Sequence, residues 1–245
     1  MHTIDAKGLY YRDLNRLVRE AVEKGEKDIL LKDVNGQYYI GDGLRKNVRI
    51  TVEGVPGNDL AAFMDGPTVI VKGNAQDNIG NTMNSGKVVV HGHAGDVLGY
   101  GMRGGKLHIL GDVGYRIGIH MKAHKKQVPA IIAGGTAGDF FGEYMAGGVL
   151  ILLGLDTKDT DPIVGNYLGT GMHGGVIFVR GKVDKDRCGA EVGILDPDEG
   201  DTKLLKEHLT EYCADLGLRL EDLMAKPFKK LIPVSERPYG NLYAY

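Results

Sequence analysis

The chain between residues 49 and 181 is built from short segments in which aliphatic side chains alternate with polar side chains or glycine. Residues 68–73 (TVIVKG), 87–92 (KVVVHG) and 106–111 (KLHILG) are examples. Five β-branched and aliphatic residues that end at a glycine predict a strand followed by a turn. The segments between these predicted strands are too short and irregular for helices, so the region is predicted to be all-β.

The predicted strands recur with a period of 19 residues. Six of the eight methionines keep one phase: their first three spacings are 19 residues, and the last two are 24 and 27. The methionine series is Met64, Met83, Met102, Met121, Met145 and Met172, and a glycine series is Gly54, Gly73, Gly92, Gly111, Gly135, Gly154 and Gly181. Two further series are Leu60, Ile79, Leu98, Ile117, Phe141 and Leu168, and Ala61, Gly80, Gly99, Gly118, Gly142 and Gly169. Repeats with a period near 20 residues are typical of solenoids.

Strands that follow one another without helices can pair in parallel only if the chain winds around an axis. The sequence therefore predicts a single-stranded, right-handed parallel β-helix of about six to seven rungs, with adjacent rungs about 4.8 Å apart. Alternation along the strands points two aliphatic columns inward. These columns are Ile50, Val69, Val88, Leu107, Ile131, Leu150 and Ile177, and Val52, Val71, Val90, Ile109, Ala133, Leu152 and Val179. The unbranched methionines are interpreted as packing at a corner of variable shape, not as a soft-metal site.

The glycine series has a backbone explanation, because the corners of a narrow coil need positive φ or close approach between chains. Residues 99–104 (GYGMRG) fit a dinucleotide-binding motif, but no helix pattern follows them, so this interpretation is rejected. A corner series contains Asn58, Asp77, Asp96, Tyr115, Asp139 and Asn166. Asp and Asn at turns usually bond their own backbone. The glycine spacing of calcium-binding β-rolls is missing, so no metal site is predicted.

An apolar column is expected on the outer wall, between the two inward columns. It consists of Thr51, Ile70, Val89, His108, Ile132, Ile151 and Phe178. An exposed apolar stripe needs a cover, and two covers are open at this point: the terminal helices or a partner subunit. Polar insertions at 123–129 and 155–162 break the period and are predicted to loop out. Such loops mark either a binding face or a tolerated surface insertion.

Three segments are predicted. Residues 1–47 form an N-terminal cap, with an amphipathic helix over 11–24 that ends at Gly25 and a hairpin-like pair of strands, 29–31 and 37–40, around the turn at Asn35. Residues 48–183 form the β-helix. Residues 184–245 contain an acidic irregular segment, a helix that begins at Asp201 or Thr202 and ends at Gly217, and an extended tail from 227 onward that docks on this chain or a neighbour.

Composition excludes several classes of function. The net charge is −2, and no basic patch with interleaved aromatics indicates nucleic acid as a partner. The N-terminus lacks a signal core and no run approaches 18 apolar residues, so no membrane partner is expected. Cys188 and Cys213 lack metal-type spacing and indicate a reduced, cytoplasmic protein. We find no nucleophile elbow, phosphate loop, cysteine cluster or convergent histidines, and therefore predict no catalytic, cofactor-binding or metal-binding residues in this chain.

The recurring Gly-x-x-Met-x-Gly-Gly signature at 99–105, 142–148 and 169–175 resembles the GXGXG domain. That family includes the C-terminal β-helix of the glutamate synthase large subunit and the β-helical subunit of formylmethanofuran dehydrogenase. The resemblance covers roughly residues 49–190. The continuation at 185–189 (KDRCG), the acidic segment and the helix after it are similar to the end of the glutamate synthase polypeptide, which favours that enzyme.

The resemblance implies a stand-alone, non-catalytic scaffold subunit of a split glutamate synthase. The assembled complex would convert glutamine and 2-oxoglutarate to glutamate. FMN and the iron–sulfur cluster would belong to partner subunits, as would the amidotransferase activity, and the chain could also form a homo-oligomer. The first alternative is the β-helical subunit of a formylmethanofuran dehydrogenase complex. The second is a free-standing β-helix enzyme that acts on a polysaccharide.

Overall fold

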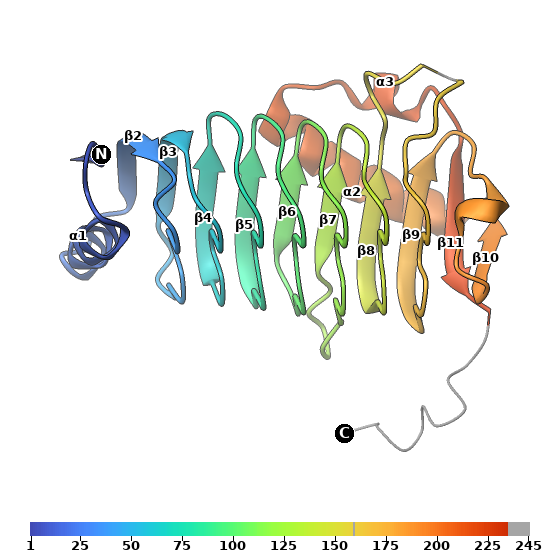
Figure 1. Cartoon of the computed structure of the whole chain (residues 1–245), viewed down its shortest axis with the longest axis horizontal. Helices are drawn as coiled ribbons and strands as arrows, with labels where there is room; N and C mark the ends of the chain where they lie inside the picture. Colours follow the sequence, from blue (N-terminus) through green and yellow to red (C-terminus); the bar gives the residue numbers. More distant parts are fainter. Residues whose placement is uncertain (159, 235–245) are drawn as a thin grey trace.

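The computed structural model describes residues 1–158 and 160–234. One 11-stranded sheet runs along the molecule in the order β1-β2-β3-β4-β5-β6-β7-β8-β9-β11-β10 (Figure 1). The first nine strands pair in parallel, each with the next along the chain, which makes the predicted parallel β-helix. Its strands are β1 (His2–Asp5), β2 (Asp28–Asn35), β3 (Arg49–Val55), β4 (Asp65–Val71), β5 (Ser85–Val90), β6 (Lys106–Ile109), β7 (Ala130–Ala133), β8 (Ala146–Leu152) and β9 (Gly174–Arg180).

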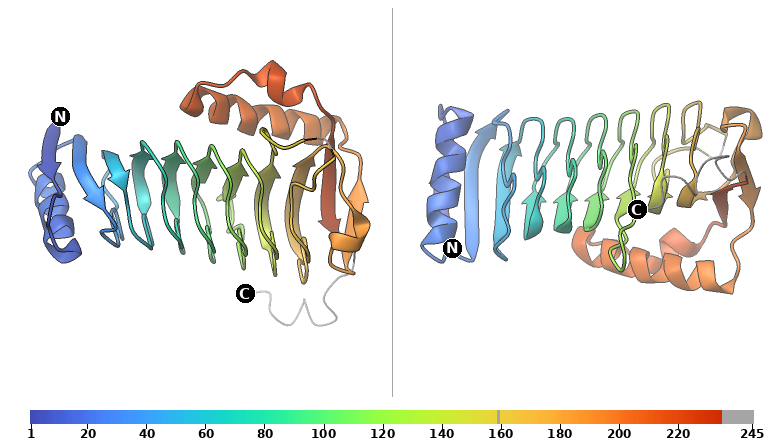
Figure 2. Two further views of the ribbon diagram at one scale, coloured as in Figure 1. Left: turned by 45° about the horizontal axis from the view of Figure 1, so that its top comes forward. Right: turned by 90° about the horizontal axis from the view of Figure 1, so that it is seen from below.

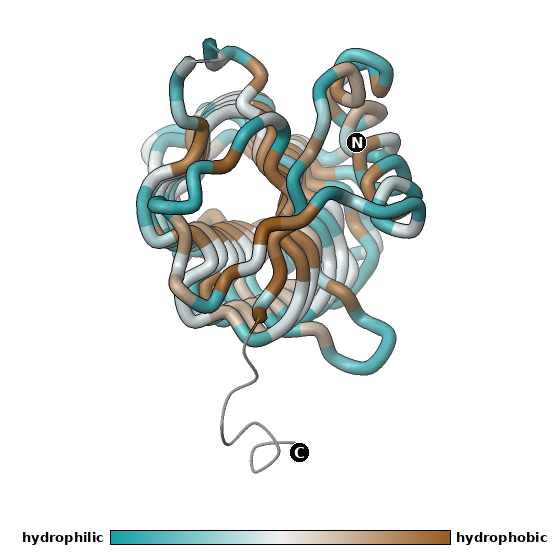
Figure 3. Tube along the Cα trace, turned by 90° about the vertical axis from the view of Figure 1, so that its right-hand side faces the viewer, coloured by the Kyte–Doolittle hydropathy of each residue, from teal (hydrophilic) through white to brown (hydrophobic). Residues whose placement is uncertain are grey.

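The strand register agrees with the sequence repeat. Val69 pairs with Val88, which pairs with Leu107, and the ladder continues to Ile177 without a slip in the inward columns. Members of both predicted inward columns are completely buried. Figure 3 looks along the coil and shows hydrophobic positions of successive rungs superposed on its walls. The six repeat methionines are at most 2% exposed, which confirms that they pack in the core.

The repeat extends further in both directions than the sequence indicates. In each rung the methionine N–H donates to the carbonyl three residues earlier, as Met83 does to Gly80. Leu44 makes this bond to Gly41 before the first methionine, and Val192 makes it to Gly189 after the last. Leucine and valine occupy the methionine position in these two rungs. On this wall the coil therefore continues beyond residues 49–181, in which the sequence repeat is recognised.

The hairpin predicted around Asn35 is absent from the described N-terminal segment. β2 pairs in parallel with β1 on one side and β3 on the other, and residues 37–40 are not a strand. These residues instead form the part of the first rung that lies between its strand and the strand of the next rung, where Tyr39 N–H donates to Asn58 O at 3.1 Å. We name this side of the coil, made of the non-strand segments that precede the methionine position in each rung, the turn wall. The apparent turn signal marks the corner of a rung. Whether residues 1–47, 48–183 and 184–245 act as separate units stays a prediction.

The two ends of the coil are closed differently. Helix α1 (Tyr11–Glu23) lies across the N-terminal end, as predicted, and buries Leu14, Val18, Ala21 and Val22 against the first rungs (Figure 2). At the other end β11 (Phe228–Pro233) pairs antiparallel with β9, and β10 (Val192–Leu195) pairs antiparallel with β11. The predicted tail thus docks on this chain as far as residue 234. Its remainder, 235–245, lies outside the described residues.

Helix α2 (Glu199–Leu216) lies along the outside of the later strands (Figure 2). Asp198 and Asp201 form a capping box at its start, and Gly217 ends it with φ 71°. The helix begins two residues before the predicted Asp201. The 3-10 turn η1 (Lys185–Arg187) precedes it, and helix α3 (Leu220–Met224) follows.

The cover of the outer apolar column comes from this chain for the later strands. Leu205, Leu209 and Tyr212 of α2 form one buried cluster with Ile132, Ile151 and Phe178. The earlier members Thr51 and Ile70 are only partly buried. The terminal-helix alternative is therefore confirmed where α2 reaches.

Candidate functional site

The corner carboxylates tie rungs together. The side-chain oxygen of Asp77 accepts from the N–H of Asp96 at 2.9 Å, and Asp96 accepts in turn from Tyr115 at 3.1 Å. Asp139 likewise accepts from Asn166. The expectation that these residues bond their own backbone is wrong, because the next rung presents a donor one period further on. Within the described residues, no group of three or more His, Cys, Asp or Glu has the geometry to hold a metal ion.

Close approach between rungs explains part of the glycine series, whereas Gly54, Gly154 and Gly181 have positive φ. A Cβ at Gly135 would lie 2.6 Å from the N of Asp112 and 2.8 Å from the carbonyl carbon of Gly111, both on the preceding rung. The small series serves the other predicted purpose, since Gly118 has φ +72°. Both backbone reasons expected from the sequence, close approach and positive φ, are therefore found among these glycines.

A cluster of charged side chains lies between α2 and the sheet. Lys87 bonds Asp215 at 2.8 Å and Glu211 at 3.2 Å, and Lys106 also pairs with Glu211. Burial works to raise the pKa of Asp215, but hydrogen bonds from His108 and Lys87 outweigh it and hold the pKa below the usual value. Burial also works to raise the pKa of Glu211, but hydrogen bonds from Lys106 and Lys87 hold that pKa below its usual value. We name these four residues with His108 the α2 clamp.

The clamp includes a fully buried histidine. His108 Nδ1 lies 2.7 Å from Asp215 Oδ2, while its Nε2 has no partner in the described part of the chain. His208 on α2 also leaves its Nδ1 unpartnered, and burial lowers its pKa. Tyr212 donates to Ile109 O at 2.9 Å, and its ring meets His108 edge-on. The charged groups are used to hold α2 on the sheet.

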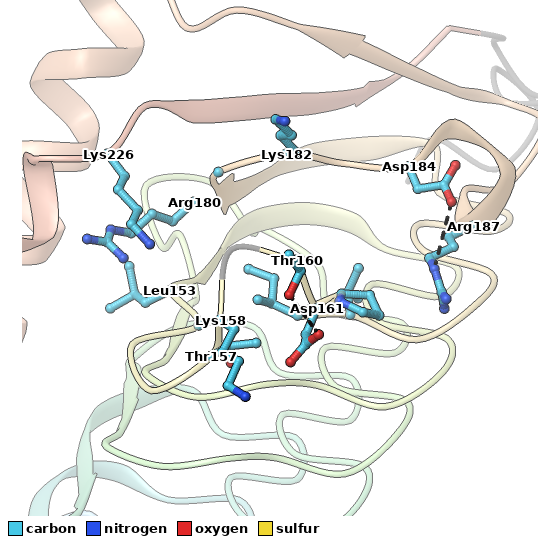
Figure 4. A pocket seen from close by; sticks show the side chains of 15 residues that line it. Leu153, Thr157, Lys158, Thr160, Asp161, Arg180, Lys182, Asp184, Arg187 and Lys226 are labelled. Carbon is cyan, nitrogen blue, oxygen red and sulfur yellow. Dashed lines mark hydrogen bonds and ion pairs between the residues drawn. The ribbon is translucent and has the colours of Figure 1, made fainter.

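The second insertion lines a pocket of about 390 Å³ (Figure 4). Residues 157–158 and 160–164 form one side, and the end of β9 with Lys182, Asp184 and Arg187 forms another. Arg180 donates to the carbonyls of Leu223 and Asp222 and so holds the end of α3. Lysine and arginine side chains line the pocket together with the carboxylates of Asp161 and Asp184, so its lining carries charges of both signs. That it is a binding face stays a prediction.

The turn wall carries stacked aromatic rings along its outer side. His120 stacks on Tyr144 with ring centroids 5.4 Å apart and an interplanar angle of 10°, and Tyr100 meets His120 edge-on at 5.9 Å. These three residues, named here the aromatic ladder, come from three successive rungs. Tyr100 and Tyr144 remain 42% and 41% exposed.

The first insertion projects beside this ladder and is the green loop below β6 and β7 in Figure 1. His124 and Gln127 exchange two backbone hydrogen bonds of 3.0 Å, so Lys125 and Lys126 stand at the tip of a closed turn. Lys122 occupies the position of Arg103 one rung further along. Arg103, Lys122, Lys125 and Lys126, named the basic corner, are all exposed.

Sequence analysis missed the ladder and the basic corner. A usable signal was present: His120 and Tyr144 each precede a repeat methionine, and Arg103 and Lys122 each follow one. Phase in the repeat therefore places His120, Tyr144, Arg103 and Lys122 on the turn wall, whereas Lys125 and Lys126 come from the insertion. The stacking of the rings depends on side-chain rotation, which the repeat does not specify.

Comparisons with known proteins identify the family. Residues 28–234 match the model of the GXGXG motif family. An uncharacterized protein of Methanocaldococcus jannaschii (MJ1350) is 48% identical over 249 residues, which cover 98% of this chain and 95% of that protein. A crystal structure of the formyltransferase/hydrolase complex from Methylorubrum extorquens with methylofuran contains a chain of the same fold. It aligns with a TM-score of 0.64 and 20% identity, over 93% of this chain and 89% of that one.

The family match begins in β2 and ends after β11, so it spans the two additional rungs that the structure reveals. None of the described helices has the length and apolar character to cross a membrane. The match over most of its length shows that the chain belongs to the GXGXG motif family.

Proposed function

We propose that this chain is a non-catalytic scaffold subunit of a multi-subunit enzyme complex, in which partner chains carry the reaction. The observation that carries the proposal is whole-chain correspondence. The solved chain of the same fold belongs to an assembled complex, and 89% of its length aligns with this chain. The relative from Methanocaldococcus jannaschii is also of matching extent. Separate chains of this size and fold therefore exist, and one of them acts within an enzyme assembly.

Two kinds of complex are candidates. The solved neighbour comes from a formyltransferase/hydrolase complex that binds methylofuran, which supports a formylmethanofuran dehydrogenase type of assembly better than glutamate synthase. Glutamate synthase stays as the second candidate, favoured by residues 185–189 (KDRCG), the acidic segment and α2. Arg187, Cys188 and Gly189 continue the turn wall, where Leu168 N–H donates to Arg187 O at 2.8 Å. In either complex, flavin, iron–sulfur or other cofactors would be held by partner subunits.

Purification of the tagged full chain from native cells tests the proposal. We expect defined partner chains to be recovered in fixed ratio. Chains of a formylmethanofuran dehydrogenase would select the first candidate, and flavin and amidotransferase chains the second. Recovery of the chain alone would contradict the scaffold proposal, as would turnover of a polysaccharide by the isolated chain.

A further inference from the structure

We propose that the basic corner and the adjoining aromatic ladder form the docking surface for an acidic segment of a partner subunit. This inference deepens the proposed function and rests on it. It concerns one place on the turn wall. Arg103 and Lys122 directly follow the methionines of the rungs that carry Tyr100 and His120, and the exposed Lys125 and Lys126 lie in the insertion that follows Lys122.

The charges at this corner lack internal compensation. Lys87 and Lys106 in the α2 clamp are paired with carboxylates, and Lys230 pairs with Asp201 at 2.8 Å. Among the described residues, none of the four cations of the basic corner has a carboxylate within 4.0 Å. Like charges held close together repel one another. A complementary acidic surface would relieve this repulsion and would favour one orientation of docking.

The first insertion gathers these cations at one place. Lys122 N–H donates to Met102 O at 3.0 Å, which fixes Lys122 on the rung next to Arg103. The loop then turns back, since a Cβ on Gly104 would lie 3.2 Å from the Cβ of Gln127. The tip residues Lys125 and Lys126 are therefore held near the rung of Arg103, and the insertion adds two charges to the two that the repeat supplies.

The aromatic ladder supplies the apolar part of the surface. Exposed tyrosine and arginine are enriched at protein interfaces, where rigid rings bury area at low entropic cost. Protein fits this surface better than nucleic acid, because His120 is stacked on Tyr144 and a face of each ring is already occupied. Binding of single strands needs open ring faces along a basic groove, and the net charge of the chain is −2. The occupant is thus a protein segment that combines carboxylates with apolar side chains.

Charge reversal in the intact complex tests this assignment. The tagged full chain carrying Lys125→Glu and Lys126→Glu is purified from native cells beside the wild type. We expect recovery of partner chains to fall about tenfold or more. The matched control carries Arg45→Glu and Lys46→Glu, because Arg45 follows Leu44 as Arg103 follows Met102, at the far end of the same wall. The control should retain its partners, and a thermal melt should show all three proteins folded.

Cross-linking identifies the occupant. A zero-length carbodiimide joins an ammonium group to a carboxylate, and we expect Lys122, Lys125 or Lys126 linked to Asp or Glu of a partner chain. If the Lys125→Glu, Lys126→Glu variant recovers partner chains as well as the wild type does, this inference is overturned while the scaffold proposal stays intact. Links from these lysines only within this chain, or association lost on nuclease treatment, would also overturn it. Recovery of no partner chain by the wild type would overturn both proposals.

Discussion

The sheet wall under α2 and the turn wall at the first insertion differ in whether this chain covers their outward-facing side chains. Both present large side chains and lysines outside the coil. Under α2 the apolar column is buried and the lysines are paired with Glu211 and Asp215. On the turn wall the rings of Tyr100 and Tyr144 stay partly exposed and the lysines lack partners among the described residues. The chain covers one wall with its own helix and leaves the rings and lysines of the other wall exposed.

The largest difference should appear when a ring is removed from each wall. Phe178 is fully buried beneath α2, whereas Tyr144 is 41% exposed. We expect Phe178→Ala to lower the free energy of unfolding by about 3–5 kcal/mol and Tyr144→Ala by less than about 1 kcal/mol. Urea unfolding of the two variants measures this. Similar losses would mean that the turn wall is as well packed as the covered one.

Removal of one clamp carboxylate should have an intermediate effect. Asp215→Ala leaves the partly buried Lys87 without one of its two carboxylate partners and the buried His108 without its partner. We expect a loss of about 1–3 kcal/mol, measured by urea unfolding. Asp196→Ala is the control, because Asp196 is 82% exposed in its pair with Lys229. An equal loss in the control would contradict a special role for the clamp.

Acid should weaken the clamp without a mutation. The folded-state pKa values of Glu211 and Asp215 lie below their ordinary values of 4.5 and 3.8. Their contribution is therefore fully present above those ordinary values and is lost as the pH falls through the lower folded values. We expect protection of α2 amides from hydrogen exchange to decrease below about pH 4. In the Asp215→Ala variant this pH dependence should be smaller, and an unchanged profile would contradict the assignment.

Relieving or introducing backbone strain on the turn wall should raise or lower the stability of the protein by a smaller amount. Val97 has φ 62° and Asn78, one rung earlier, has φ 60°. Asn tolerates this region, whereas a β-branched residue does not. We expect Val97→Asn to stabilise by about 1 kcal/mol and Asn78→Val to destabilise by about as much, as measured by thermal melts. If the melting temperatures of both variants shift in the same direction, side-chain contacts outweigh backbone strain at these positions.

The sequence predicts the parts of the fold in which the same residue type recurs in each rung. It fails where a different residue type takes the same position in the rung. The phase of the methionines located the coil, its inward columns and its corners because packing one rung on the next imposes the same residue at each position. Leu44 and Val192 were missed because they satisfy the same apolar position with another side chain. The antiparallel entry of β11 follows from no periodic signal, and neither do the ion pairs that seat α2, since both depend on contacts between residues far apart in the chain.

The antiparallel closure by β11 also limits how long the rod can grow. A parallel coil is a template for its own continuation, because its last strand offers the hydrogen-bonding edge that the next lap would use. β11 occupies that edge on β9 in the opposite direction, and among the described residues only the short β10 follows it in the sheet. A second copy therefore finds no free edge on β9 from which the parallel ladder could continue head to tail into a filament.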